Sequence, residues 1–315
     1  MSFATLRNIN NFGETSRQKT VEGNLIEFFN WGFIDRGAYV NVPVPTSGAY
    51  GGDFSRLRHV SDSRYTAGTV WEGIRGNWVW ESGLGVGVPV KVSGVYVNGT
   101  LNTSGYNIDY VRGRVVFNTA IASTGVVQVP HSYKAIQWVS ARDNPLNQVQ
   151  YKSQRPDNTN FLLSSGNFAT LYDNKINLPC VSVEAFSRNN KPYQIGGGDY
   201  VDYTIKFHIL AEDDNMASNI SDTICNQEFK TIFMFDFDRM AQFNAFPLSQ
   251  QGYLQPSALS YPDLVAVTGT GGYRATAKVD QGKLFMKSCK FQQGNYLHQN
   301  LYLSTVDMVA EVILL

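Results

Sequence analysis

The chain has 315 residues, of which 43% are hydrophobic and 17% are charged, with 28 glycines and 11 prolines. Basic and acidic residues are equal at 26 each, a balance that argues against a dedicated nucleic-acid binder or a protein that binds anionic membranes. The small charged fraction and the many glycines favour a mainly β, α+β protein rich in turns, and the length favours two or three folding units.

The cysteines and the N-terminal segment indicate the compartment. Cys180, Cys225 and Cys289 are far apart and lack CxxC spacing, so we expect neither a disulfide framework nor a zinc site. The N-terminus has no basic segment followed by an apolar run, and no stretch reaches the roughly 18 apolar residues that a membrane span needs. We therefore expect a soluble protein made in a reducing cytoplasm, with no signal peptide and no membrane partner.

Residues 20–37, TVEGNLIEFFNWGFIDRG, have the spacing of an amphipathic helix. Thr20 is the expected N-cap, and Gly37 follows the expected end. The apolar stripe consists of Leu25, Phe28, Phe29 and Phe33, widened by Ile26, Trp31 and Ile34. Few polar positions remain, so either the core of the protein or a neighbouring subunit must cover this helix. Its candidate packing or interface anchors are Phe28, Phe29, Trp31 and Phe33.

Residues 43–90 are rich in glycine, proline and aromatic residues without sustained periodicity, which predicts extended, loop-like chain. Because long irregular segments are often functional, we interpret residues 43–56 as an arm that reaches a neighbouring subunit. Trp71, Trp78 and Trp80 fit either a core or subunit interface or a platform on which sugars or bases stack. Together with the preceding helix, this tract forms an expected N-terminal unit, residues 1–88.

Residues 95–117, VYVNGTLNTSGYNIDYVRGRVVF, alternate apolar and polar side chains almost without a break. Asn98-Gly99 and Arg112-Gly113 predict tight turns within this stretch. With residues 125–139 they form a run of about five short strands, which favours a small β-sandwich or barrel over residues 89–140. We expect Asp109 to be an outward-facing strand residue.

The second half, residues 141–315, favours an antiparallel sheet with one covering helix. Residues 180–186 and 199–210 are expected strands joined by a hairpin turn over 187–198, and the second strand alternates strictly. Asp213 or Asp214 is the expected cap of a helix that buries Met216, Ile220 and Ile224. Further strands are expected at 230–238, 274–280, 283–293 and 300–314.

The sequence contains little catalytic chemistry. His59, His131, His208 and His298 are scattered, and hydrolase serine elbows, HExxH motifs and Walker loops are absent. IGGGDY (195–200) opens a strand instead of a helix, which favours a hairpin connection over a phosphate loop. We therefore expect no catalytic residue, no metal and no cofactor.

The carboxylates leave one alternative open. Asp236 and Asp238, in DFD, are expected on one strand face, where they would either point to solvent or bind a divalent ion. The latter arrangement would indicate a metal-dependent hydrolase. Capping of the following helix accounts for the acidic run of residues 212–214.

Several stretches resemble structural proteins of tailed bacteriophages. VYVNG followed by YNIDYVRGRVVF looks like a β-module that recurs in phage virion proteins, and LPCVSVEAFSRNNKPYQIGGGDYVDYTIKFHILAEDD is similar to the core of neck and tail-terminator proteins. NLIEFFNWGFIDRGAYVNV also has the character of such assemblies. Residues 239–273 and the Trp-rich segment 71–80 fit no element of that family.

The resemblance implies a non-enzymatic virion protein, assembled in the bacterial cytoplasm, that forms a hexameric or dodecameric ring at the head–tail connection or at the tail terminus. Its partners would be copies of itself and adjacent neck or tail proteins, with DNA passing through a lumen without tight binding. Closed rings need two different complementary surfaces on each chain. The helix aromatics, the tryptophans, the 187–198 hairpin with Tyr193, and paired β-edges are candidates for them. A baseplate or other tail-associated component that binds carbohydrate is the alternative, and it requires exposed tryptophans.

Overall fold

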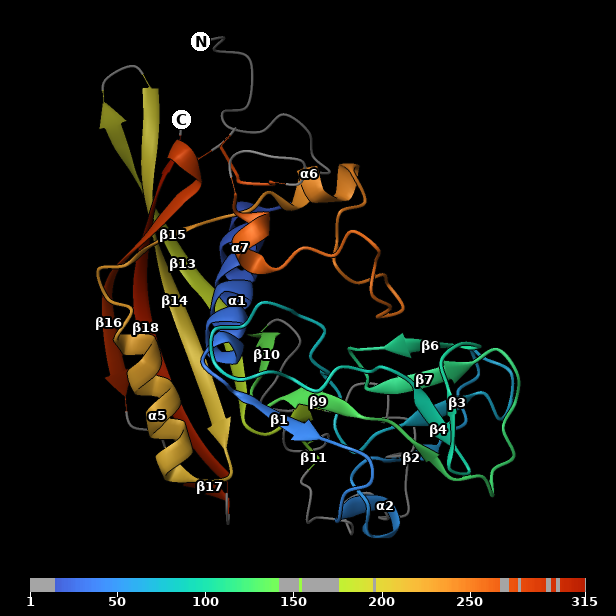
Figure 1. Cartoon of the computed structure of the whole chain (residues 1–315). Helices are drawn as coiled ribbons and strands as arrows, with labels where there is room; N and C mark the ends of the chain where they lie inside the picture. The colour runs from blue at the N-terminus through green and yellow to red at the C-terminus, as the bar shows by residue number, and fades with distance from the viewer. Residues whose placement is uncertain are drawn as a thin grey trace.

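The computed structural model describes residues 15–141, 153–154, 176–194, 197–266, 272–276, 279–292, 296–298 and 301–314. Within these ranges the chain forms two curled sheets, and an N-terminal helix packs on one of them (Figure 1). We call the sheet with long strands the large sheet and the other the small sheet. The mainly β, α+β class predicted from the sequence is confirmed.

The large sheet has the strand order β10, β13, β14, β18, β16, β15, and β17 pairs with β18. The strands are β10 (Gln137–Ser140), β13 (Cys180–Gln194), β14 (Gly197–Ala211), β15 (Thr231–Phe233), β16 (Lys283–Gln292), β17 (Tyr296–His298) and β18 (Leu301–Leu314). Neighbouring strands are antiparallel except β10 and β13, which are parallel. Register shifts in β13 and β16 mark bulges, which bend and twist the sheet.

Strict alternation along the strands buries one face of the large sheet. In β14, every second side chain from Val201 to Ile209 faces the core and is at most 1% exposed. Helices α1 (Arg17–Asp35) and α5 (Asp214–Cys225) pack on this same face (Figure 1), since their apolar side chains belong to the same core cluster. The other face of the sheet carries charged and polar side chains along most of its strands and a small apolar cluster that includes Cys180 and Leu210 at one end.

Both helices were predicted, with two errors of detail. Helix α1 begins at Arg17 instead of after Thr20, because Ser16 is the N-cap and accepts a hydrogen bond from the Lys19 backbone N–H at 3.3 Å. Asp213 caps α5 as predicted, accepting from the Asn215 backbone N–H at 3.1 Å. Met216, which was expected in the core, is 42% exposed, and the neighbouring Ala217 packs against the sheet instead.

The small sheet has the strand order β5, β4, β8, β2, β3, β7, β6. Its strands are β2 (Arg56–His59), β3 (Val70–Glu72), β4 (Val95–Val97), β5 (Thr100–Asn102), β6 (Tyr106–Asp109), β7 (Arg114–Phe117) and β8 (Val127–Gln128). The Asn98-Gly99 turn is confirmed, with both residues at positive φ (49° and 79°). The loop-like interpretation of 43–90 is wrong at β2 and β3, which are too short to show periodicity.

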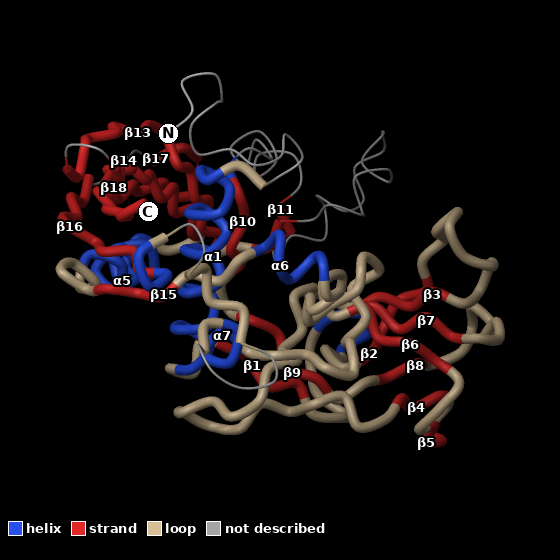
Figure 2. The backbone as a smooth tube through the Cα atoms, turned by 90° about the horizontal axis from the view of Figure 1, so that it is seen from above, coloured by secondary structure: helices blue, strands red, loops and turns tan. Residues whose placement is uncertain are grey.

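The remaining short strands form two separate pairs. Strand β1 (Tyr39–Val42) pairs with β9 (His131–Lys134), and β11 (Ser153–Gln154) pairs in parallel with β12 (Ile176–Asn177). Helix α2 (Ala49–Gly52) falls within the proposed arm of residues 43–56. Figure 2 shows β1 and β9 in the region between the two sheets.

Residues 237–266 lie in the chain between β15 and β16 of the large sheet and extend to contact the small sheet; we call them the strap. The strap contains α6 (Phe237–Gln242) and α7 (Tyr261–Leu264). Its middle part docks on the small sheet: the Tyr110 backbone N–H donates to the Gly252 carbonyl at 3.0 Å, and the Tyr253 hydroxyl lies 3.4 Å from that of Tyr65. The strap thus accounts for most of residues 239–273, the stretch that fitted no expected element.

Three sequence predictions fail in and near the strap. The expected strand 230–238 is limited to β15, and in the described part of 274–280 Arg274 makes only an isolated bridge to Phe235. Asp109 does not face outward; it is 1% exposed and accepts from the Arg112 backbone N–H at 2.9 Å. Its Oδ1 atom also lies against Gly252, where a Cβ atom would be 2.1 Å away, so the strap needs glycine at this contact.

Candidate functional site

The aromatic residues of α1 mostly face the large sheet. Phe29 is 3% exposed, stacks on Trp138 at a centroid distance of 5.4 Å and meets Phe207 edge-on at 5.4 Å. Phe33 lies 5.5 Å from Trp138, and Phe28 lies 5.8 Å from Tyr261 of the strap. Trp31 is partly exposed. Of the predicted anchors on this helix, Phe29 is a core residue and the other three keep accessible surface.

The three tryptophans do not form one exposed platform. Trp71 and Trp78 are 2% and 1% exposed and belong to the core of the small sheet. The Trp78 ring stacks on His131 at 4.2 Å, and its Nε1–H donates to the Arg75 carbonyl at 2.9 Å. Trp80 keeps accessible surface and lines a cavity. The carbohydrate alternative therefore has a single accessible tryptophan of the three. The Tyr193 side chain lies outside the described residues.

Asp236 and Asp238 do not share a strand face, so that prediction is wrong, and the alternative of a metal site that depended on it fails with it. Asp236 is the N-cap of α6 and accepts from the backbone N–H groups of Asp238 and Arg239 at 3.0 and 3.1 Å. Asp238 lies in the first turn and accepts from the Thr15 hydroxyl at 2.8 Å. The part of the chain that the structure describes contains no group of three or more His, Cys, Asp or Glu residues placed to hold a metal ion.

The face of the large sheet opposite the helices, which we call the outer face, carries paired charges along most of its strands and a small buried apolar cluster, with Cys180, Leu210 and Leu301, at the end beside β10. Lys287 contacts Asp202 at 3.1 Å and Glu311 at 3.0 Å, and His208 lies 3.3 Å from Glu184. Burial raises the pKa of Asp202, but hydrogen bonds from Lys191 and Lys287 outweigh it and hold this pKa below its ordinary value. Alternating positive and negative groups leave this face without a strong field of either sign.

Two stretches at the margins of the large sheet have no strand beside them in the described residues. β10 pairs only with Cys180–Val183, which leaves the outer edge of β13 open from residue 187 to 194. On the other margin, β15 and the chain just before it pair with β16 up to Met286, which leaves residues 288–292 open. Phe186, beside the first open edge, is 66% exposed, and Phe291, on the second, is 40% exposed.

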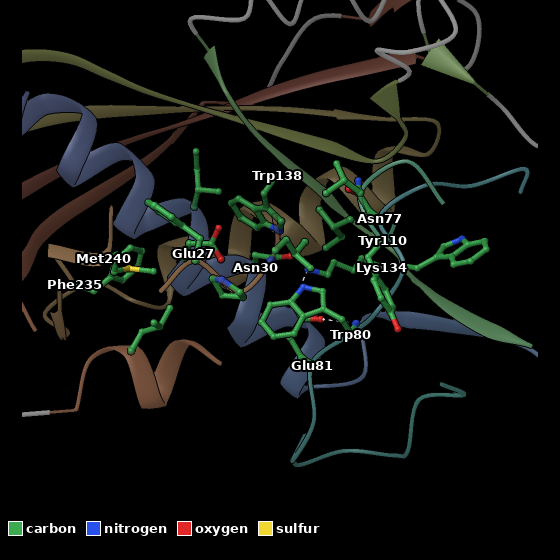
Figure 3. Close-up of a pocket in the computed structure, with 18 of the residues that line it drawn as sticks. Glu27, Asn30, Asn77, Trp80, Glu81, Tyr110, Lys134, Trp138, Phe235 and Met240 are labelled. Carbon is green, nitrogen blue, oxygen red and sulfur yellow. Dashed lines mark hydrogen bonds and ion pairs between the residues drawn. The ribbon is translucent and has the colours of Figure 1, made fainter. Parts of the chain in front are cut away.

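A cavity of about 290 Å³ lies where α1, β9, β10 and the strap meet. Its polar lining comes from Glu27 and Asn30 of α1 together with Asn77, Glu81 and Lys134 (Figure 3). Its apolar walls include Trp80, Tyr110, Trp138, Phe237, Met240 and Phe246. Pockets of this kind, largely aromatic with few polar groups and located between structural units, are common ligand sites.

The charges in this cavity are unequally matched. Glu81 is 4% exposed; its Oε1 contacts the Lys134 ammonium at 2.6 Å, and its Oε2 accepts from the Trp80 backbone N–H at 3.1 Å. Glu27 accepts from the Asn30 side chain, and no ion pair of Glu27 within hydrogen-bond range is found among the described residues. Burial raises the pKa of Glu27, and the positive charge of Lys134 offsets this only in part.

Few features of the sequence point to this cavity. Its charged and amide residues come from positions 27, 30, 77, 81 and 134, which no motif connects. The one available signal was the pair Glu27 and Asn30, three residues apart within the aromatic-rich part of the helix, which places two polar groups on one face.

Comparisons with known proteins identify no relative: no protein-family model matches the chain, and no curated protein matches it. Within the described ranges, every helix is too short or too polar to cross a membrane. Any function must therefore be argued from the surfaces and the cavity.

Proposed function

We propose that this chain is a non-enzymatic structural protein of a tailed-bacteriophage virion that forms a homo-oligomeric ring in the neck or tail, at the head–tail connection or the tail terminus. The resemblance of residues 95–117 and 178–214 to such proteins first suggested it. The observation that carries it is the pair of open edges on the large sheet, because a ring subunit needs two different complementary surfaces.

The two open edges have the geometry for pairing between copies. They lie on opposite margins of the sheet and are offset along the strands: residues 187–194 lie level with the last residues of β18, from 309 onward, whereas residues 288–292 pair with residues 305–309 in the middle of β18. Joining the edge of one copy to that of the next would shift each copy along the strand direction. Such a shift tilts the strands, and a closed sheet requires tilted strands.

The outer face supports the same proposal. If the sheets of several copies close into a ring, one face of the sheets lines the lumen. The face available for this is the outer face, since α1 and α5 cover the other one. Its paired charges would present a nearly neutral wall, past which DNA moves without the salt-dependent adhesion that clustered lysines or arginines cause.

The open edge of β13 provides a direct test. Consecutive residues of a strand direct their backbone N–H groups to opposite sides, and proline has no N–H. We therefore compare Asn189→Pro with Asn190→Pro: one removes an N–H that faces β14, and the other removes one that faces the open edge. Light scattering and negative-stain imaging of the full chain measure assembly, and circular dichroism measures folding.

We expect the wild-type protein to form a discrete ring. The proline variant that keeps the β13–β14 hydrogen bonds is expected to remain folded but to lose the ring. The other proline variant is expected to lose thermal stability as well. A wild-type chain that stays strictly monomeric, alone and with purified particles, would contradict ring assembly. Rings formed by both proline variants would contradict the role of the β13 edge.

A further inference from the structure

The cavity beside α1 is not needed for ring assembly, yet it is hollow, aromatic and charged. Its volume of about 290 Å³ is roughly twice that of an engineered 150 Å³ cavity that accommodates benzene. It therefore has room for an aromatic or aliphatic group together with one polar head. We propose that this cavity binds a small organic cation, a primary ammonium or guanidinium group on a short apolar stem, with Glu27 as its charge partner.

The choice of a cation follows from the pairing of the charges. Lys134 is engaged with Glu81 at 2.6 Å, and both oxygens of Glu81 have partners. Glu27 receives only the neutral Asn30 side chain as a described hydrogen-bond donor. With both carboxylates ionised, the site carries one negative charge in excess. A ligand ammonium or guanidinium would balance it and form a charge-assisted hydrogen bond.

The walls suit the rest of such a ligand. Trp80, Trp138 and Tyr110 contribute large rings, and cations are attracted to the faces of such rings. Phe237, Met240 and Phe246 of the strap provide an apolar surface for a short stem. One face of Trp138 is already covered by Phe29 at 5.4 Å, which fixes the orientation of its ring before any ligand arrives.

The same head group can come from two sources: a free amine, or a lysine or arginine side chain of another protein chain. Phenethylamine is a suitable probe because it combines a ring, a short stem and an ammonium group, and phenethyl alcohol is its neutral counterpart of similar shape. Trp80 and Trp138 line the cavity, so intrinsic fluorescence reports binding to the full chain, and calorimetry measures the affinity.

We expect phenethylamine to bind at least about tenfold more tightly than phenethyl alcohol, because a charged hydrogen bond in an aromatic site is stronger than a neutral one. Glu27→Gln keeps the shape and the contact with Asn30 but removes the charge, so it should abolish this preference. Glu228→Gln removes a carboxylate beyond the end of α5 and should leave the preference intact. Circular dichroism verifies that both variants fold.

The pH dependence of the wild-type protein tests the same inference without a variant. Glu27 is faced by Lys134 of β9, Glu81 of the loop before β4 and Tyr261 of α7, besides Asn30 on its own helix. Its carboxyl group ionises only above its raised pKa, so phenethylamine affinity should increase as the pH rises through that value. Phenethyl alcohol affinity should not change.

Equal binding of amine and alcohol, or unchanged amine binding by Glu27→Gln, would overturn the inference, and so would tighter binding of a neutral saccharide such as glucose. Amine binding to the separate chain that disappears upon ring formation would support it and identify a side chain of a neighbouring copy as the source. Binding that persists in the ring would support it with a free amine as the source. Failure of ring assembly leaves these measurements unaffected.

Discussion

The two sheets are built on different principles. The large sheet has strands of up to 15 residues and an aliphatic and aromatic core in which Phe207 and Ile209 are fully buried. The small sheet has strands of two to four residues, and among its most deeply buried side chains is Arg114, which is 1% exposed. One sheet is thus stabilised mainly by apolar burial, the other by burial together with charge pairing.

The charge pairing in the small sheet is local and specific. Arg114 contacts Glu72 at 2.7 Å and Asp62 at 3.1 Å, with all three side chains at most 4% exposed. The hydrogen bonds of Arg64 lower the pKa of Asp62 to about 2, despite burial, which raises it. Short strands bury too little apolar area to fix their own register, and a buried ion pair has one good arrangement. We infer that these buried ion pairs fix the strand register of the small sheet, whereas the alternation of apolar and polar side chains fixes the register of the large sheet.

The strongest test of this difference removes the central guanidinium. Arg114→Met should lower the free energy of unfolding by about 3–5 kcal/mol, because it leaves buried carboxylates without that charge partner. Urea unfolding followed by tryptophan fluorescence measures it, since Trp71 and Trp78 lie in the core of the small sheet. Arg64→Met is the matched control: it removes a partner of the same Asp62 that is 45% exposed, and should cost about 1 kcal/mol or less. Similar costs for the two variants would contradict a specifying role for the buried ions.

The same difference determines what the sequence could predict. Strict alternation identified β14 and β18 almost to their ends, and Asp213 identified the start of α5, because these signals are local. Strands β2 and β3 have three or four residues, too few for a periodicity, and apart from each other their partners, β8 and β7, lie far along the chain. The alternation in DFD predicted a strand, but Asp236 instead caps α6, and the helix begins there. The cavity is lined by segments spread from residue 26 to residue 264, so only the folded chain brings it together.

The dependence of stability on acidic pH provides a second test of this difference, with a somewhat smaller expected effect. His131 packs against Trp78 in the small-sheet region, and burial lowers its pKa to about 4, from an ordinary value of 6.5. Between these two values the unfolded chain binds a proton that the folded chain does not, so stability falls as the pH falls from 6.5 to 4. The loss should be roughly 3 kcal/mol.

Urea unfolding at a series of pH values measures this loss. His131→Gln keeps a donor for the Val129 carbonyl, which lies 3.0 Å from His131 Nδ1, and should remove most of the pH dependence in this interval. His208→Gln, on the outer face of the large sheet, should leave it in place. The same slope in the His131 and His208 variants would show that the acid sensitivity does not arise beside the small sheet.

The smallest effect concerns the large sheet and its covering helix. Asp213→Ala removes the cap of α5 and should lower stability by about 1 kcal/mol. Asp213→Ser should restore most of it, because serine also accepts from the backbone N–H of the first turn, and Asp222→Ala, an exposed charge change within the same helix, should have little effect. Since the buried side chains of α5 belong to the core of the large sheet, its loss should shift the circular dichroism transition more than the fluorescence of Trp71 and Trp78, measured in a background in which Trp31, Trp80 and Trp138 are replaced by phenylalanine. Equal shifts of both signals would show that the two sheets unfold as one unit, and the strap that joins them would then be the structural reason.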